Sequence, residues 1–167
     1  PQTGCDLRLE GVAGLEVVVS PERGFRSPAY PGDFARLETG LSQVQWQPVA
    51  KDESEAARGW QPLARLVWLL AYYGARDGLL PRIPQDRTFT LAAWPDYTVI
   101  PMEANHLRIW AYLKWNAADL DTIVEATGVG RAQVLGSLNA GHLCGQVQLS
   151  EATAVSQGAT ESSHKSL

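Results

Sequence analysis

The segment WQPLARLVWLLAYYGAR, residues 60–76, constrains the fold most, because it is apolar on nearly every side of a helix. Its main stripe has the i, i+3, i+4, i+7 spacing of one helical face. The stripe consists of Leu63, Leu66, Val67, Leu70 and Tyr73 or Gly74, and three further residues widen it: Leu69, Ala71 and Tyr72. A helix that is apolar all round is buried inside a protein. We therefore predict a central core helix, since the apolar run contains Arg65 and is shorter than the roughly 20 residues of a membrane span.

The composition allows such a helix to be buried in a globular protein. Of 167 residues, 45% are hydrophobic and 19% charged, which is enough apolar material for a core. The formal net charge is −4, whereas nucleic-acid binders carry a basic excess that neutralises phosphates. The two cysteines, Cys5 and Cys144, lie far apart in the sequence and are expected to be reduced thiols. No cationic-then-apolar leader is visible, so a cytoplasmic location without membrane contact is expected.

Residues 14–30 predict a β-hairpin in a small N-terminal module that spans residues 1–57. Two strand-like runs flank the polar SPERG sequence, and three consecutive valines favour the extended state. Pro21 and Gly24 suit a tight reversal between the runs.

Three further segments complete this N-terminal module. Residues 31–41 predict a short helix with Asp33 as the N-cap and Gly40 as the terminator. Residues 44–49 alternate apolar and polar letters, which is typical of a half-exposed strand. The charged segment 51–59 is the expected internal boundary.

From Glu103 onward the pattern predicts three consecutive helices. In the first helix, Leu107, Trp110, Leu113 and Ala111 are expected on the buried face. Asp119 is predicted to be the N-cap of the second helix, and Gly128 stands where a left-handed terminating residue belongs. The third helix begins near Gly130 or Arg131. Its expected inward residues are Val134, Leu138 and Leu143.

These helices resemble the winged-helix family of helix-turn-helix domains that occurs in bacterial regulatory proteins. The matching residues, within positions 103–149, are Ile123, Gly128, Val129, Val134 and Leu138. The resemblance implies a wing strand at residues 146–149 that pairs with a strand at 88–91. An ordinary three-helix packing unit remains the alternative. The expected domains are therefore residues 1–57, a winged-helix-like domain at 58–149, and a disordered tail at 150–167.

In the family, the exposed side of the third helix enters the major groove of DNA. Carried onto this sequence, that side consists of Gly130, Arg131, Ala132, Leu135, Gly136 and Asn139. Base discrimination would then depend on Arg131 and Asn139, with Gln133 at the margin. Because the charges between His106 and Leu143 sum to zero, the sequence disfavours DNA binding without excluding it.

The same side suits contact with protein. Ala132, Gly136 and Ala140 form a row of small residues four apart, and Leu135 beside them is an apolar anchor. This surface is predicted to dock another helix, either on a partner or from residues 60–76 of the same chain. The complete expected interaction set is Ala132, Leu135, Gly136, Asn139, Trp115 and Tyr112.

The aromatic residues of the two helical segments have two possible roles. Trp68, Tyr72, Tyr73, Trp110, Tyr112 and Trp115 are expected to pack together in the core, or some of them to form an exposed patch. Trp94 is expected to close a connector over the core.

The sequence offers little catalytic chemistry. His106 is interpreted as a surface partner of Glu103, and His142 with Cys144 makes only half of a metal site. No catalytic residue, metal site or cofactor is therefore predicted.

The sequence as a whole predicts an α+β protein with a hairpin-containing N-terminal module and a winged-helix-like C-terminal unit. We expect a non-enzymatic, cytoplasmic, bacterial regulatory or signalling protein that contacts a protein partner or itself. The bacterial assignment reflects a resemblance in composition alone. The alternatives are a DNA-binding transcriptional regulator and a structural subunit of a larger assembly whose N-terminal strands extend another protein's sheet.

Overall fold

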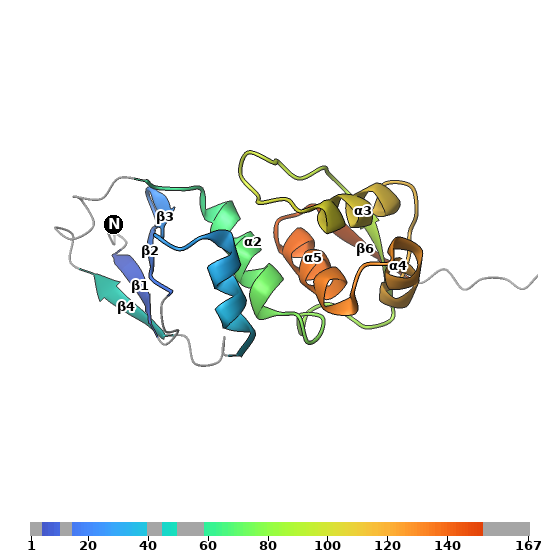
Figure 1. Cartoon of the computed structure of the whole chain (residues 1–167), viewed down its shortest axis with the longest axis horizontal. Coiled ribbons are helices and arrows are strands. Elements are labelled where there is room, and N and C mark those ends of the chain that lie inside the picture. Colours follow the sequence, from blue (N-terminus) through green and yellow to red (C-terminus); the bar gives the residue numbers. More distant parts are fainter. Residues whose placement is uncertain (1–4, 11–14, 40–44, 50–58, 152–167) are drawn as a thin grey trace, which may run out of the picture.

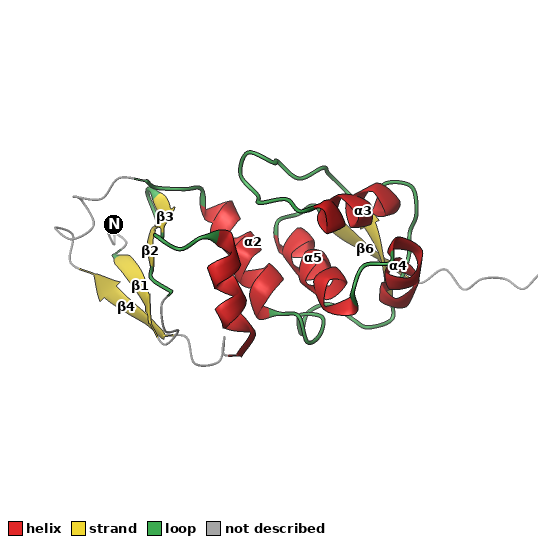
Figure 2. Ribbon diagram, in the orientation of Figure 1, coloured by secondary structure: helices red, strands yellow, loops and turns green. Residues whose placement is uncertain are grey.

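The N-terminal part of the chain forms a four-stranded antiparallel sheet (Figures 1 and 2). The structure is a computed structural model that describes residues 5–10, 15–39, 45–49 and 59–151. The strands are β1 (Asp6–Glu10), β2 (Val17–Ser20), β3 (Gly24–Arg26) and β4 (Gln45–Val49), in the order β3-β2-β1-β4. The α+β class is thus as predicted.

The β2–β3 hairpin is confirmed in its predicted position. Val18 pairs with Arg26, and Ser20 pairs with Gly24 at the turn. Gly24 has a φ of 105°, which L side chains rarely adopt. Strand β4 occupies the predicted segment, but its expected half-exposed pattern is wrong, because the side chains of Gln45 to Pro48 are all exposed. Of the predicted boundary segment 51–59, residues 51–58 lie outside the described part of the chain.

A 3₁₀ helix, η1 (Pro31–Thr39), occupies the predicted short helical segment. Its start differs from the prediction, because Pro31 is the first helical residue and Asp33 therefore lies in the first turn. The Asp33 carboxylate reaches back and accepts a hydrogen bond from the backbone N–H of Tyr30 at 2.9 Å. The expected terminator, Gly40, lies outside the described residues.

The central helix is α2 (Leu63–Gly74), and it lies between the four-stranded sheet with η1 on one side and the C-terminal helices on the other (Figure 1). Its burial confirms the predicted role. The buried side of the helix differs in part from the predicted stripe. Val67, a member of that stripe, is 39% exposed, whereas Trp68 and Tyr72 are buried. The sheet with η1 covers one side of α2 and the C-terminal helices cover the other. Val67 is exposed because it lies between these two covered sides.

The C-terminal part combines three helices with a two-stranded sheet. The helices are α3 (Ala104–Leu113), α4 (Leu120–Thr127) and α5 (Arg131–Leu143), and the strands are β5 (Arg87–Leu91) and β6 (Val147–Glu151). The predicted pairing of these strands is confirmed, with Phe89 opposite Leu149 and Leu91 opposite Val147. Ser150 belongs to β6 and not to a tail, while residues 152–167 lie outside the described part.

The turn between α4 and α5 has the predicted chemistry. The Asp119 carboxylate accepts from the backbone N–H of Thr122 at 2.8 Å, which caps α4. Gly128 ends the helix in the left-handed conformation with φ 65°. Val129 then enters the core, with 2% of its surface exposed. This local geometry follows directly from residue types.

Other expectations of burial are wrong. Leu107, Ala111, Leu143 and Trp94 are exposed, although each was expected to face the core. In α3 the buried residues are His106, Ile109, Trp110 and Leu113, so the buried face is rotated toward the histidine. Amphipathic spacing alone does not decide which of two apolar faces meets the rest of the protein.

Two hydrophobic clusters build the interior. The first joins the sheet and η1 to α2, through residues such as Val17, Phe34 and Leu69. The second lies within the C-terminal helices and strands, with Trp110 and Ile123 among its residues. Within the described ranges, none of the helices is both long enough and apolar enough to cross a membrane.

Candidate functional site

The side of α5 that was assigned to partner contacts lies against α2. Leu135, Gly136 and Asn139 are all buried. A Cβ built on Gly136 would overlap the carbonyl oxygen of Tyr72 and lie 3.0 Å from Cδ2 of that tyrosine. The absence of a side chain at Gly136 therefore permits the close approach of the two helices. These three residues belong to the interior, which corrects their assignment to an accessible surface, and residues of the same chain provide the docked helix.

Asn139 fastens the connector that follows α2 onto α5. Its side-chain oxygen accepts from the backbone N–H of Leu80 at 3.0 Å. Its amide nitrogen donates to the carbonyl oxygens of Ala75 at 2.7 Å and Gly78 at 2.9 Å. Both the oxygen and the nitrogen of this amide are thus engaged in hydrogen bonds to the connector. Asn139 is therefore not positioned to read a base edge, as the DNA alternative requires.

Of the residues assigned to contacts on α5, those in its first turn are accessible. Arg131 and Ala132 are exposed, and the Arg131 guanidinium forms an ion pair with Asp121 of α4. Gln133 is half-buried, and its side-chain oxygen accepts from Nδ2 of Asn105 at 2.8 Å. Of the three residues proposed for nucleic acid, Arg131 alone presents a cation, and that cation is already paired.

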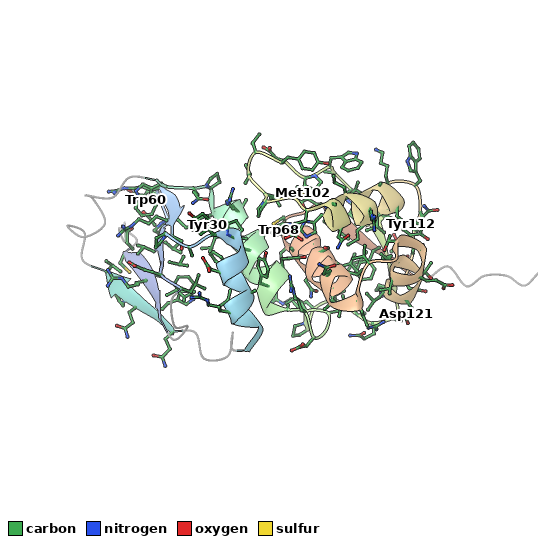
Figure 3. The ribbon with its side chains drawn as sticks, viewed as in Figure 1. Tyr30, Trp60, Trp68, Met102, Tyr112 and Asp121 are labelled. Carbon is green, nitrogen blue, oxygen red and sulfur yellow. The ribbon has the colours of Figure 1, made fainter. Side chains whose placement is uncertain are left out.

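A recess of about 310 Å³ adjoins this first turn. Its lining consists of Gln85, Asp86, Asp119, Leu120, Asp121 and Arg131. Three aspartates and one arginine are thus among its lining residues, and Figure 3 shows Asp121 at the outer edge of the C-terminal unit. Acidic residues therefore outnumber basic ones around the first turn of α5, which disfavours contact with the phosphates of a duplex.

A second surface is accessible on α3. Six residues at one side of this helix and its continuation are exposed, and we call them the α3 face: Ala104, Leu107, Arg108, Ala111, Lys114 and Trp115. Trp115 is 83% exposed and Leu107 is 46% exposed. Tyr112 is half-buried at the margin, where it packs on the second hydrophobic cluster (Figure 3). Of the predicted interaction set, Trp115 is therefore largely accessible and Tyr112 is partly accessible.

The cations of the α3 face have no acidic partner among the residues that the structure describes. Arg108 and Lys114 are both exposed, and neither forms an ion pair there. The Lys114 ammonium lies 5.9 Å from the centroid of the Trp115 ring, within reach of a cation–π interaction. The face is therefore basic and apolar, although the whole chain is acidic.

Behind the α3 face, an aromatic cluster joins α3 to α2. Trp68 and Tyr72 stack with ring centroids 4.7 Å apart, and Figure 3 shows Trp68 at this junction. The His106 ring meets both edge-on, at 5.0 Å from Trp68 and 4.7 Å from Tyr72. The expectation of core packing is confirmed for these two α2 aromatics and for Trp110, which are all buried.

His106 is buried at the core of this cluster, which corrects its interpretation as a surface partner of Glu103. Its Nδ1 atom accepts from the backbone N–H of Glu103 at 3.0 Å, as part of a capping box. Burial, with a smaller contribution from the charge of Arg76, lowers the pKa of His106 to about 4. Burial also raises the pKa of Tyr72 to about 12. Both groups are neutral near pH 7, so the cluster is suited to packing.

The remaining reactive groups do not assemble into a site. Burial raises the pKa of the Cys144 thiol to about 11, which keeps it protonated. Both Cys5 and Cys144 are free. Within the described ranges, no three His, Cys, Asp or Glu residues are grouped to hold a metal ion.

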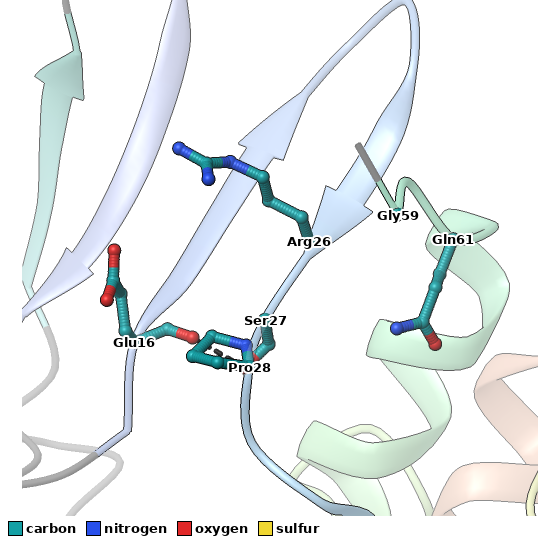
Figure 4. A pocket seen from close by; sticks show the side chains of 6 residues that line it. All are labelled: Glu16, Arg26, Ser27, Pro28, Gly59 and Gln61. Atoms are coloured by element: carbon teal, nitrogen blue, oxygen red, sulfur yellow. Dashed lines mark hydrogen bonds between the residues drawn. The ribbon is translucent and has the colours of Figure 1, made fainter. Parts of the chain in front are cut away.

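A larger recess of about 540 Å³ lies beside the N-terminal sheet (Figure 4). It is lined by Glu16, Arg26, Ser27, Pro28, Gly59 and Gln61. Backbone hydrogen bonds of 2.9 and 2.7 Å between Phe25 and Gln61 hold one wall against β3. Sequence reasoning missed this recess, because its lining comes from three separate segments and contains no motif.

Sequence reasoning also missed Leu107, Arg108 and Lys114 as a surface, since Leu107 was assigned to the core. The sequence did contain a signal that this side of the helix is exposed, because two charged residues, Arg108 and Lys114, lie on the same side as Leu107. No family model matches the chain, and neither a curated protein nor a solved structure matches it. Its function therefore has to be inferred from the surfaces described above.

Proposed function

We propose that the chain is a non-enzymatic regulatory or signalling component of the bacterial cytoplasm that acts through protein contacts of a winged-helix-like unit. The observation that carries this proposal is the position of α2 on α5. Gly136 lies against Tyr72 of α2 and Leu135 is buried in the second hydrophobic cluster, so the side of α5 that would enter a DNA groove is occupied by the protein itself. A helix in this position supports the fold and leaves other surfaces for partners.

Several local features support the winged-helix-like assignment. Gly128 and Val129 make the turn between α4 and α5, and β5 pairs with β6 after the third helix. Ala118, between α3 and α4, forms a further bridge to Phe89 of β5. Three consecutive helices with a paired strand before and after them are compatible with such a unit. Shape of this kind does not by itself determine function.

The DNA-binding alternative is disfavoured by both geometry and charge. The side chain of Asn139 is hydrogen-bonded to the connector after α2, and the side-chain oxygen of Gln133 accepts a hydrogen bond from Asn105. Arg131 is paired with Asp121 beside two further aspartates. The contacts that would supply base readout and phosphate neutralisation are thus both missing from this end of α5.

A titration with a fluorescent random-sequence DNA duplex at low salt tests the proposal. We expect no salt-sensitive rise in anisotropy for the wild-type chain. Asp121→Asn, which frees Arg131 without adding a cation, is the sensitive variant and is also expected to leave the duplex unbound. Tight wild-type binding that decreases with salt and is lost in Arg131→Ala would establish the DNA-binding alternative and overturn the proposal.

The assembly-subunit alternative has one observation in its favour. β4 is an edge strand of the described sheet, and Trp46 on it is 40% exposed. An exposed edge can pair with another strand, although Pro48 lacks an N–H for such a ladder. Light scattering at increasing concentration would detect self-assembly of this kind, and Trp46→Lys should abolish it.

A further inference from the structure

The α3 face has the shape of a helix-packing surface with nothing packed on it in the described structure. Its six members share one side of the helix, where Ala104, Leu107, Ala111 and Trp115 form an apolar stripe beside the two cations. The opposite side of α3 is already buried through Ile109, Trp110 and Leu113. The helix is therefore held firmly by one side while it presents a second ordered stripe to the exterior.

From this face we infer a docking site for an acidic amphipathic helix of another protein. The inference rests on the proposed function and names its contact surface and the chemistry of its partner. The partner helix would carry apolar residues at i, i+3, i+4 and i+7, flanked by Asp or Glu.

The apolar part of the face explains how a helix would fit. Ala104 and Ala111 lie two turns apart, and small side chains there let a second helix approach closely. Leu107 lies between them, and Trp115 stands at the end of the stripe with 83% of its surface exposed. Tryptophan is among the residues that most often dominate the energy of a protein interface.

The charges on the face determine the sign of the partner. Arg108 and Lys114 lie beside the apolar stripe, and neither has a carboxylate partner in the described part of the chain. Glu103, just before the helix, donates its backbone N–H to Nδ1 of His106 and forms no ion pair with either cation among the described residues. Charges at an interface rim orient a partner and accelerate its association more than they add affinity. Acidic residues on the partner therefore provide register, and its apolar residues provide most of the affinity.

An anionic membrane or a nucleic acid fits the face less well. Two cations near an anionic lipid surface contribute only about 1 kcal/mol each, which is too little for stable attachment without a deep apolar anchor. The same C-terminal unit also bears the recess lined by Asp86, Asp119 and Asp121, which a polyanion would avoid. A compact acidic helix can contact the α3 face alone.

A peptide-display selection tests the inference with the full chain as bait. The library contains helical peptides of about 15 residues with randomised positions, and binders to the selection support alone are removed first. We expect the enriched peptides to carry Asp or Glu beside an apolar stripe. One enriched peptide, labelled for anisotropy, should lose at least tenfold in affinity with Trp115→Ala and with the pair Arg108→Glu and Lys114→Glu.

Matched substitutions at other exposed positions serve as controls. Tyr30→Ala removes an aromatic side chain that is 81% exposed, and Arg82→Glu reverses an exposed charge. Both should leave peptide affinity unchanged. Circular dichroism and the fluorescence of the buried tryptophans check that each variant is folded.

The remaining outcomes separate this inference from the proposed function. Failure to enrich any peptide, enrichment of basic peptides, or affinity that ignores the α3 substitutions would overturn the docking site. In the last case the protein-contact function would still stand. Lys114-dependent binding to phosphatidylserine vesicles or to single-stranded DNA would overturn the inference in favour of a lipid or nucleic-acid partner. Duplex binding that is lost in Arg131→Ala would instead overturn the proposed function itself.

Discussion

Replacing Gly136 with alanine should test the packing of α2 on α5 directly. The added Cβ would overlap the carbonyl oxygen of Tyr72 and would lie 3.3 Å from its carbonyl carbon. Real Cβ atoms essentially never come within 3.0 Å of another heavy atom. The obstacle is the backbone of a buried helix and not the end of a flexible side chain. The two helices therefore have to separate by several tenths of an ångström to accept a single methyl group.

Two opposing effects determine the size of the change. Overpacking a tight interface costs about 1–3 kcal/mol, whereas exchanging glycine for alanine inside a helix stabilises by about 1 kcal/mol. Because the backbone of α2 is held by the first hydrophobic cluster on its other side, we expect the upper part of the first range. The free energy of unfolding of Gly136→Ala should then fall by about 1–2 kcal/mol.

Urea unfolding followed by tryptophan fluorescence measures this change, since Trp68 and Trp110 are both buried. Gly32→Ala is the matched control, because a Cβ there meets nothing within 4 Å. Its effect should stay within about 0.5 kcal/mol. If Gly136→Ala were as stable as the wild-type protein or more so, the helix-propensity gain would be unopposed and α2 could not lie on α5 as described.

Three further predictions concern titration, buried hydrogen bonds and capping. The folded pKa of His106 is about 4, below the value of about 6.5 in the unfolded chain, so the unfolded state binds more protons between these values. Stability should be fully present above pH 6.5 and fall by up to about 3 kcal/mol as the pH is lowered to 4, and His106→Gln should flatten that part of a pH series of urea midpoints. Asn139→Asp keeps an acceptor for Leu80 but loses the two donated bonds, so it should destabilise by about 2–4 kcal/mol and speed hydrogen exchange in the 75–80 connector; unchanged exchange would contradict the fastening role. Asp119→Ala should cost about 1 kcal/mol through loss of the α4 cap, and thermal unfolding at the same stability as wild type would show that the cap is not formed.

Local features of this protein were predictable because they depend on neighbours in the sequence. Asp119, Gly128 and the hairpin turn at Gly24 each meet a backbone requirement that few residue types satisfy. The pairing of β5 with β6 was predicted only through the winged-helix resemblance, since residues about 60 positions apart carry no local signal of contact.

The candidate sites were predicted less well, because both helices involved have more than one apolar side. Leu135 and Gly136 were assigned to a surface, and Leu107 to the core, whereas the structure has the reverse. The sequence was compatible with either side of each helix being buried. The alternative in which residues 60–76 cover α5 was recognised from the sequence, but its preference over an external partner was not.

The sequence by itself determined that residues 60–76 contain a buried helix and that the chain carries a net negative charge. It also determined that helix α4 begins after Asp119 and ends at Gly128. Only the tertiary structure decided that Tyr72 lies against Gly136 and that Trp115 stays accessible. Periodicity reports which residues share a face of one helix. Which face becomes interior depends on how much apolar surface each arrangement of the elements removes from water, and that is a property of the whole fold.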